Sequence, residues 1–160
     1  MYNTPLDLLD AFRATPDTLQ ALLGDVTHAQ AAVARGGDEN WSVVEVVCHL
    51  RDAEERGLER MRSMRDMPDP KIAGYDQARW AVERNYAATD LSVAFSAFLK
   101  LRATHVMELA GLSQEQWEQS GQHAELGSIT ISSHTLHLVS HDAVHLAQIA
   151  RQLKMGAGTI

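Results

Sequence analysis

Histidine is the residue type with the clearest potential for chemistry, and four of the eight histidines lie close together near the end of the chain. His134 is followed by His137, His141 and His145 at spacings of three, four and four residues, and Gln148 comes three residues later. Side chains at these spacings share one face of a helix, because each residue turns the chain by about 100°. Apolar residues occupy the adjoining arc, so the pattern predicts a stripe of imidazoles that lines a crevice.

Two of these histidines have the spacing of a metal-binding pair. His141 and His145 lie one helical turn apart and could place two ring nitrogens on one ion, with a third ligand from another helix. His49 is the candidate for that third ligand. Three neutral nitrogen donors leave a fourth position for water, which is the arrangement of catalytic rather than structural metal sites. Histidines beside an apolar face also occur as ordinary hydrogen-bonded residues, and spacing alone leaves that role open.

His137 competes with His145 as the partner of His141. The helix rises about 11 Å over the two turns from His137 to His145, so both cannot bind the same ion at about 2.1 Å. One of the two must therefore lie outside the set of ligands.

Three carboxylates near these histidines are candidates for a general base or for orienting an imidazole ring. Glu45 and Asp52 lie four residues before and three residues after His49, and Asp142 directly follows His141. Each could equally be a solvated carboxylate. The charged run RDAEERGLERMR that contains Asp52 is typical of a solvated helix face with local ion pairs.

Long helices must position these residues. Thr4 and Pro5 are typical of a helix start, and Thr15 and Pro16 repeat that signal, so the region up to Gly24 is either one kinked helix or two short ones. Ser42 and Glu45 form a capping-box pattern that opens a helix to about Asp66.

The second half of the chain predicts further helices after a proline-rich loop, DMPDPKIAG. They are a short helix over 75–85, a longer one over 90–111, one turn around residue 117 and a last helix over 130–155. Four principal helices with long connections predict an all-α, four-helix bundle with crossover connections. We expect one domain over residues 1–160.

Composition excludes several classes of function. The formal net charge of −7 argues against a basic surface for nucleic acid. We expect no signal peptide, because the opening MYNTPLDLLDAF has two Asp and no basic n-region, and no membrane span, because no run of eighteen apolar residues occurs. We therefore expect a cytoplasmic protein. The single cysteine, Cys48, cannot form an intramolecular disulfide and is expected in the core.

Two segments, ENWSVVEVVCHLRDAE and GSITISSHTLHLVSHDAVHLAQIARQL, resemble the DinB-like superfamily of metal-binding four-helix bundles. Its members carry a tryptophan and a small hydroxyl residue at the start of the second helix, a histidine about seven residues later, and a closing H-x-x-x-H-x-x-Q. The matching residues are Trp41, Ser42, His49, His141, His145 and Gln148. The resemblance implies that the three histidines of this set are the metal ligands, and it places His137 outside the ligand set, lining the pocket or packing against another helix.

The resemblance also implies a function. We expect a divalent metal, with zinc or nickel ahead of manganese or iron, a small-molecule substrate and a homodimer. The leading hypothesis is transfer of a low-molecular-weight thiol, such as bacillithiol, mycothiol or glutathione, to a small electrophile. The alternatives are a metal-dependent hydrolase that uses a metal-bound water and a noncatalytic stress protein that binds metal or a small ligand.

Overall fold

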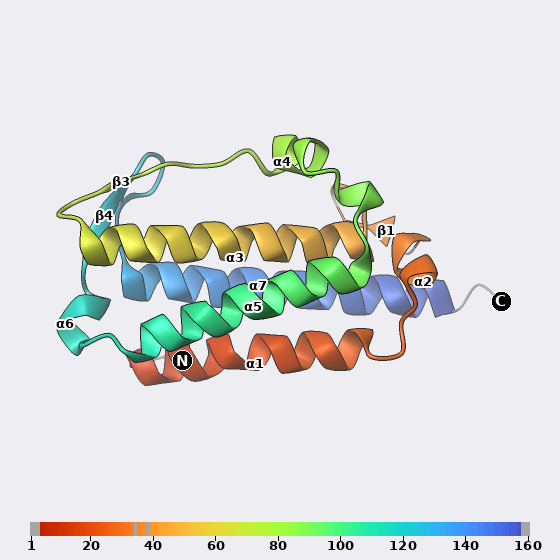
Figure 1. Ribbon diagram of the computed structural model, residues 1–160, viewed down its shortest axis with the longest axis horizontal. Coiled ribbons are helices and arrows are strands. Elements are labelled where there is room, and N and C mark those ends of the chain that lie inside the picture. Colours follow the sequence, from red (N-terminus) through yellow and green to blue (C-terminus); the bar gives the residue numbers. More distant parts are fainter. Residues whose placement is uncertain (1–3, 34, 38, 158–160) are drawn as a thin grey trace.

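The computed structural model describes residues 4–33, 35–37 and 39–157. Four long helices run side by side along the described part of the chain (Figure 1). These helices are α1 (Pro5–Leu23), α3 (Val43–Asp66), α5 (Leu91–Ala110) and α7 (Ile131–Ala157). Shorter helices are α2 (His28–Val33), α4 (Gln77–Glu83), η1 (Tyr86–Ala88) and α6 (Gln114–Trp117). The predicted all-α bundle is confirmed.

The connections cross the bundle, as predicted. Helix α3 packs against α5 and α7, and α1 packs against the same two helices. Helices α1 and α3 are therefore diagonal neighbours, although they are consecutive long helices in the chain. A bundle with this order needs crossover connections, which the segment around α2 and the segment around α6 provide (Figure 1).

Local capping signals fix most of the helix starts. The Ser42 hydroxyl accepts from the Glu45 backbone N–H, and the Glu45 carboxylate accepts from the Ser42 backbone N–H. The same reciprocal pattern starts α1 at Thr4. Helix α1 continues through Pro16, so the first region is one helix rather than two.

Two small sheets were not predicted. Strands β1 (Arg35–Gly36) and β2 (Trp41–Ser42) pair antiparallel just before α3. Strand β3 (Lys71–Ile72), from the proline-rich loop, pairs parallel with β4 (Ser120–His123), which pairs antiparallel with β5 (Gly127–Thr130). A Cβ atom at Gly121 would lie 2.9 Å from the Pro70 carbonyl oxygen, so this close approach requires glycine. The second sheet lies at one end of the bundle, beside α6 (Figure 1).

Buried apolar side chains form two clusters along the described bundle, and charged groups lie between them. One cluster contains Leu19, Val47, Cys48, Phe98 and Ile149. The other contains Phe12, Leu58, Leu109, Ile131 and Leu138. The predicted solvated face of α3 was wrong for Asp52 and Glu54, which are 0% and 1% exposed. Among the residues that the structure describes, every helix is too short or too polar to cross a membrane.

Candidate metal centre

Three histidines from α3 and α7 lie close together between these two helices. The potential ligand atoms of His49, His141 and His145 all lie within 4.8 Å of one another. Nε2 of His49 lies 2.8 Å from Nε2 of His141, and the ring centroids of His49 and His145 are 4.7 Å apart. The fold therefore brings together the three residues that the sequence singled out, although His49 lies 92 positions before His141.

The start of α3 positions His49. The ring of Trp41, in the strand directly before the helix, packs against the His49 ring with centroids 5.2 Å apart. Trp41 in turn contacts Tyr86 of η1 edge-on, with centroids 6.0 Å apart. His49 itself is only 1% exposed, so these ring contacts hold it inside the bundle.

The surroundings of His49 and His145 favour neutral imidazoles. Burial, followed by the neighbouring His141 and His145, lowers the pKa of His49 to about 3. Burial and His141 also lower the pKa of His145. Neutral imidazoles are the form that binds metal, since each offers one ring nitrogen as a donor. Three ring nitrogens this close together could hold one divalent ion.

Gln148 fixes the orientation of His145. Nδ1 of His145 lies 2.9 Å from Oε1 of Gln148, and the Gln148 amide nitrogen donates to the Gly36 carbonyl oxygen at 3.0 Å. Because an amide oxygen only accepts, His145 Nδ1 donates and its Nε2 is the atom with a free lone pair. A Cβ atom at Gly37, where φ is +86°, would lie 2.6 Å from the Gln148 amide nitrogen. The turn between β1 and β2 thus packs against Gln148, which in turn orients His145.

Asp142 approaches His141 from behind. Its Oδ1 lies 3.8 Å from His141 Nδ1, a buried nitrogen that has no hydrogen-bond partner among the described residues. Its other oxygen, Oδ2, accepts from the Thr15 hydroxyl at 3.0 Å and from Arg102 at 2.7 Å. Asp142 therefore belongs to a network of charges in the core and connects it to the histidine cluster.

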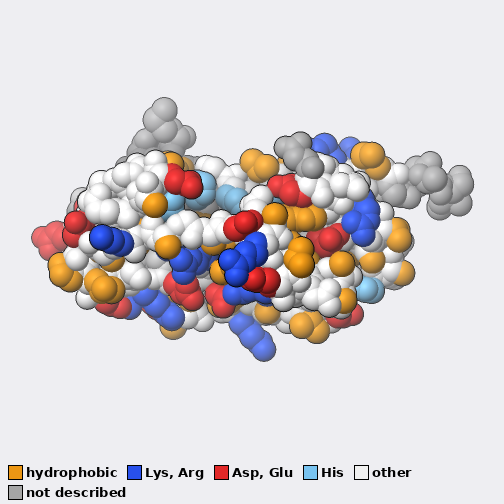
Figure 2. All heavy atoms as spheres, turned by 90° about the horizontal axis from the view of Figure 1, so that it is seen from above, with side chains coloured by type: hydrophobic (Ala, Val, Ile, Leu, Met, Phe, Trp, Pro, Cys, Tyr) orange, Lys and Arg blue, Asp and Glu red, His pale blue; other side chains and the backbone are white. Residues whose placement is uncertain are grey.

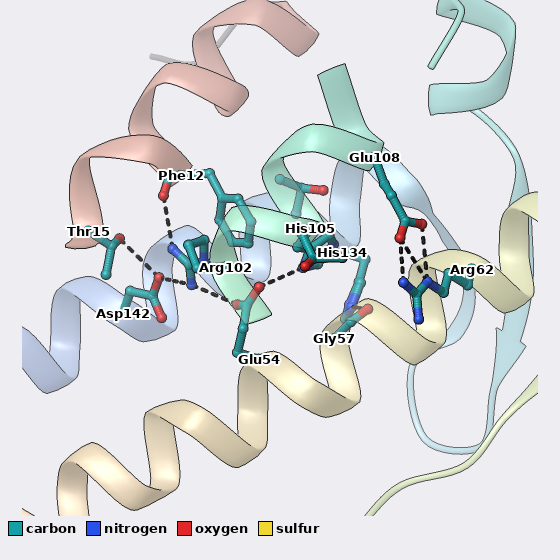
Figure 3. A network of polar contacts seen from close by, with 12 residues as sticks. Phe12, Thr15, Glu54, Gly57, Arg62, Arg102, His105, Glu108, His134 and Asp142 are labelled. Atoms are coloured by element: carbon teal, nitrogen blue, oxygen red, sulfur yellow. Dashed lines mark hydrogen bonds and ion pairs between the residues drawn. The ribbon is translucent and has the colours of Figure 1, made fainter. Parts of the chain in front are cut away.

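That network, which we call the Arg102 cluster, contains Thr15, Glu54, Arg102, His105 and Asp142 (Figure 3). Arg102 also donates to Glu54 at 2.8 Å and to the Phe12 carbonyl oxygen at 2.9 Å. His105 Nδ1 lies 2.8 Å from the second Glu54 oxygen. Burial raises the pKa of Glu54, but Arg102 and His105 outweigh this effect, so the pKa of Glu54 is lower than usual.

Sequence reasoning missed Glu54, Arg102 and His105. Phe98, Arg102, His105 and Leu109 follow one another at spacings of four, three and four residues, and all four are buried. A charged residue at the apolar spacing of a helix was the available signal, because such a position faces the core.

The other two candidate carboxylates have different surroundings. Glu45 caps α3 and accepts from Arg35 at 3.1 Å. Asp52 accepts from the Tyr86 hydroxyl at 2.6 Å and from Arg51 and Arg84 at 2.7 and 2.9 Å. Of the three candidates, Asp142 is thus the one with a contact to a histidine of the cluster.

The remaining histidines of the stripe line a cavity beside the cluster. His137 is exposed, and its ring centroid lies 6.3 Å from that of His141. It shares with His134 a cavity of about 450 Å³. His134 is buried, and its Nε2 lies 3.2 Å from the Gly57 carbonyl oxygen. Burial lowers the pKa of His134 to about 3. Figure 2 shows histidine side chains in a depression of the molecular surface, in agreement with the predicted crevice.

A four-helix bundle with crossover connections and a three-histidine cluster between its second and fourth long helices defines a recognisable class of helical protein. The family model of the DinB superfamily matches residues 11–149, and the chain belongs to this superfamily. The resemblance seen in the sequence is therefore confirmed.

Similar proteins carry names that refer to metal. Two proteins of Oceanobacillus iheyensis, each named "Putative metal-dependent hydrolase", are 26% and 28% identical over 122 and 114 residues. These alignments cover 75% and 71% of this chain and 69% and 66% of the relatives. YfiT of Bacillus subtilis has the same description and is 22% identical over 120 residues, covering 72% of this chain and 67% of YfiT.

The solved structure of Bacillus subtilis YfiT has the same fold. It superposes with a TM-score of 0.86 at 21% identity, over 94% of this chain and 86% of the YfiT chain. It is described as a probable metal-dependent hydrolase with an unusual four-helix bundle topology. The likeness shows that the two chains share one bundle fold.

Proposed function

We propose that this protein is a metal-dependent hydrolase in which His49, His141 and His145 bind a divalent ion. The observation that carries the proposal is the convergence of three imidazole nitrogens within 4.8 Å, next to a cavity that a small molecule can enter. The names of the relatives support hydrolysis as the reaction class. When bound, the ion supplies a Lewis acid that lowers the pKa of a water or thiol in its open position.

The residues of this chain have separate tasks in that proposal. The low pKa of His49 keeps its imidazole neutral and available as a ligand. Gln148 holds the proton of His145 on Nδ1, which leaves Nε2 for the ion. Asp142 faces Nδ1 of His141 and favours a proton there, so Nε2 of His141 is free in the same way.

A second candidate function is the transfer of a low-molecular-weight thiol to a small electrophile, as the sequence resemblance implies. Cys48 is buried and burial raises its pKa, so the thiol would come from a second substrate.

The proposal also includes a homodimer, which the molar mass in solution from light scattering checks.

The metal proposal is tested by elemental analysis of protein purified without a histidine tag. We expect about one divalent ion per chain in the wild type and loss of most of it in the His141→Ala, His145→Ala double variant. His137→Gln is the matched control on the same helix and should keep the ion. Equal metal content in the wild type and the double variant would overturn the proposal.

The reaction class is tested separately. Turnover of p-nitrophenyl acetate that needs the metal and no thiol is the result expected of a hydrolase. Turnover of monochlorobimane only with an added thiol would favour the transferase instead. A metal-loaded protein with neither activity would support the noncatalytic binding function.

A further inference from the structure

An arginine lines the cavity beside the histidine cluster. Arg60 of α3 lines the cavity and donates to the Ala73 carbonyl oxygen. In the described part of the chain, no carboxylate lies within ion-pairing distance of Arg60, and its buried Nε lacks an acceptor. A half-buried guanidinium whose buried Nε–H lacks an acceptor is costly, so the site favours an oxyanion as its partner.

Neighbouring side chains add neutral donors and an apolar wall. Nδ1 of His123 accepts from the backbone N–H groups of Glu125 and Leu126, at 3.2 and 3.3 Å, so its proton is on Nε2. Tyr75 contributes a hydroxyl group, and Leu126 and Ile129 contribute apolar surface. The cavity therefore combines hydrogen-bond donors with room for a carbon skeleton, as small-molecule sites do.

One carboxylate also lines the cavity. Glu125 is exposed, whereas Arg60 is half-buried. Water screens an exposed charge more strongly than a half-buried one, so the charge of Arg60 is less screened than that of Glu125.

The cavity leads to the histidine cluster along α7. His134 and His137 line it, and His137 lies one turn before His141, with ring centroids 6.3 Å apart. From His134 to His141 the helix rises about 10 Å. A small molecule of that length could contact Arg60 at one end and the cluster at the other.

We propose that this cavity binds the oxyanion end, a carboxylate or phosphate, of the small-molecule substrate, with Arg60 as its charge partner. The reacting end of the substrate then lies at the histidine cluster. This second statement rests on the proposed metal-dependent function, whereas binding of an oxyanion in the cavity does not.

The test is protein-observed NMR with the 160-residue chain and three probes: benzoate, phenyl phosphate and the neutral isostere benzamide. We expect one of the anions to shift the backbone amides of Gly74, Ile129 and Ser133 and to bind at least about tenfold more tightly than benzamide. Comparing benzoate with phenyl phosphate decides which oxyanion the cavity takes. Equal binding of all three probes, or no binding of either anion, would overturn the proposal without any variant.

Variants then identify the cation. Arg60→Gln should weaken binding of the preferred anion at least about tenfold, and Arg60→Lys should restore part of it. Arg62→Gln is the matched control, because it removes the same charge from the same helix and Arg65 still pairs with Glu108. An unchanged affinity in a folded Arg60→Gln variant would contradict the role of Arg60.

Removal of metal separates the two proposals. Each titration is repeated after dialysis against EDTA, and binding in the cavity should persist. Anion binding that disappears with EDTA would place the anion at the histidine cluster and overturn the cavity site, while it supported the metal centre. Persistent anion binding in a protein that never contains metal would leave the cavity site standing and contradict the metal centre.

Discussion

Two polar clusters lie side by side in one bundle, and they are built on opposite principles. The histidine cluster of His49, His141 and His145 collects donors of one kind, with nitrogens directed at a common point. The Arg102 cluster joins opposite charges, since Arg102 lies between Glu54 and Asp142. The second arrangement pairs opposite charges within the chain, whereas the first gathers like donors that a cation would complement.

The contrast is informative because both clusters draw on α3 and α7. Burial is therefore not what distinguishes a structural cluster from a candidate site in this molecule. The distinction is whether the partners complement one another. Asp142 belongs to one cluster and contacts the other, so the structural cluster can support the candidate site.

The largest expected effect is on stability. Arg102→Ala leaves two buried carboxylates without their cation and should lower the free energy of unfolding by about 3 to 5 kcal/mol. Arg62→Ala is the control, because Arg62 pairs with Glu108 at the surface, where such pairs contribute at most about 1 kcal/mol (Figure 3). Urea unfolding followed by circular dichroism measures both. Similar decreases in the free energy of unfolding of the two variants would contradict a structural role for the Arg102 cluster.

The second expected effect is on metal. His145→Gln should lose most of the bound ion and change the free energy of unfolding of the metal-free protein by less than about 1 kcal/mol. His145 is only half-buried, and glutamine replaces it without opening a large cavity. Elemental analysis measures the metal content, and urea unfolding in EDTA measures the free energy of unfolding of the metal-free protein. A variant that loses several kcal/mol without metal would show that the histidine cluster also supports the fold.

The two clusters also differ in how far they could be predicted. The capping-box residues Ser42 and Glu45 predict the start of α3 from neighbouring residues alone. The spacing of His141 and His145 likewise places both on one helix face. The Arg102 cluster depends on tertiary contacts of Glu54 with α5, and the local sequence around Glu54 resembles a solvated face. Pairing of β3 with β4 likewise joins segments about fifty residues apart in the chain, which no local pattern encodes. The role of the three histidines as ligands remains a prediction.

The third prediction separates the clusters by pH in the metal-free protein. The pKa of His49 is about 3 in the folded chain and about 6.5 in the unfolded chain, so the unfolded chain binds the proton first. Stability is fully present above pH 6.5 and falls as the pH drops toward 3, by up to about 1.4 kcal/mol per pH unit for this group.

The Arg102 cluster should respond in a lower range of pH. Because the pKa values of Glu54 and Asp142 are lowered, their contribution is present above about pH 4 and is lost as the pH falls further. Urea unfolding of the wild type and His49→Gln between pH 7 and pH 4 measures the difference. The variant should show a shallower slope, and parallel slopes would contradict the assignment to His49.

The smallest effect is expected at Gln148, which contacts the candidate centre only through His145. Gln148→Ala removes the acceptor that holds the proton on Nδ1 of His145 and frees the ring to rotate. Loss of such a contact typically weakens metal binding by about tenfold to hundredfold while all ligands remain. Gln148→Glu keeps an acceptor beside Nδ1 and should retain more affinity than alanine does.

Competition with a zinc-sensitive dye measures the affinities of these variants. Gln152→Ala is the matched control on the same helix, because Gln152 also donates to the Gly36 carbonyl oxygen but has no contact with His145. Weakening in Gln148→Ala alone would show that orientation of His145 tunes the centre. Equal weakening in both variants would instead assign the effect to the β1–β2 turn. The support of the histidine cluster would then come from this turn, whereas the Arg102 cluster pairs its charges within the helices.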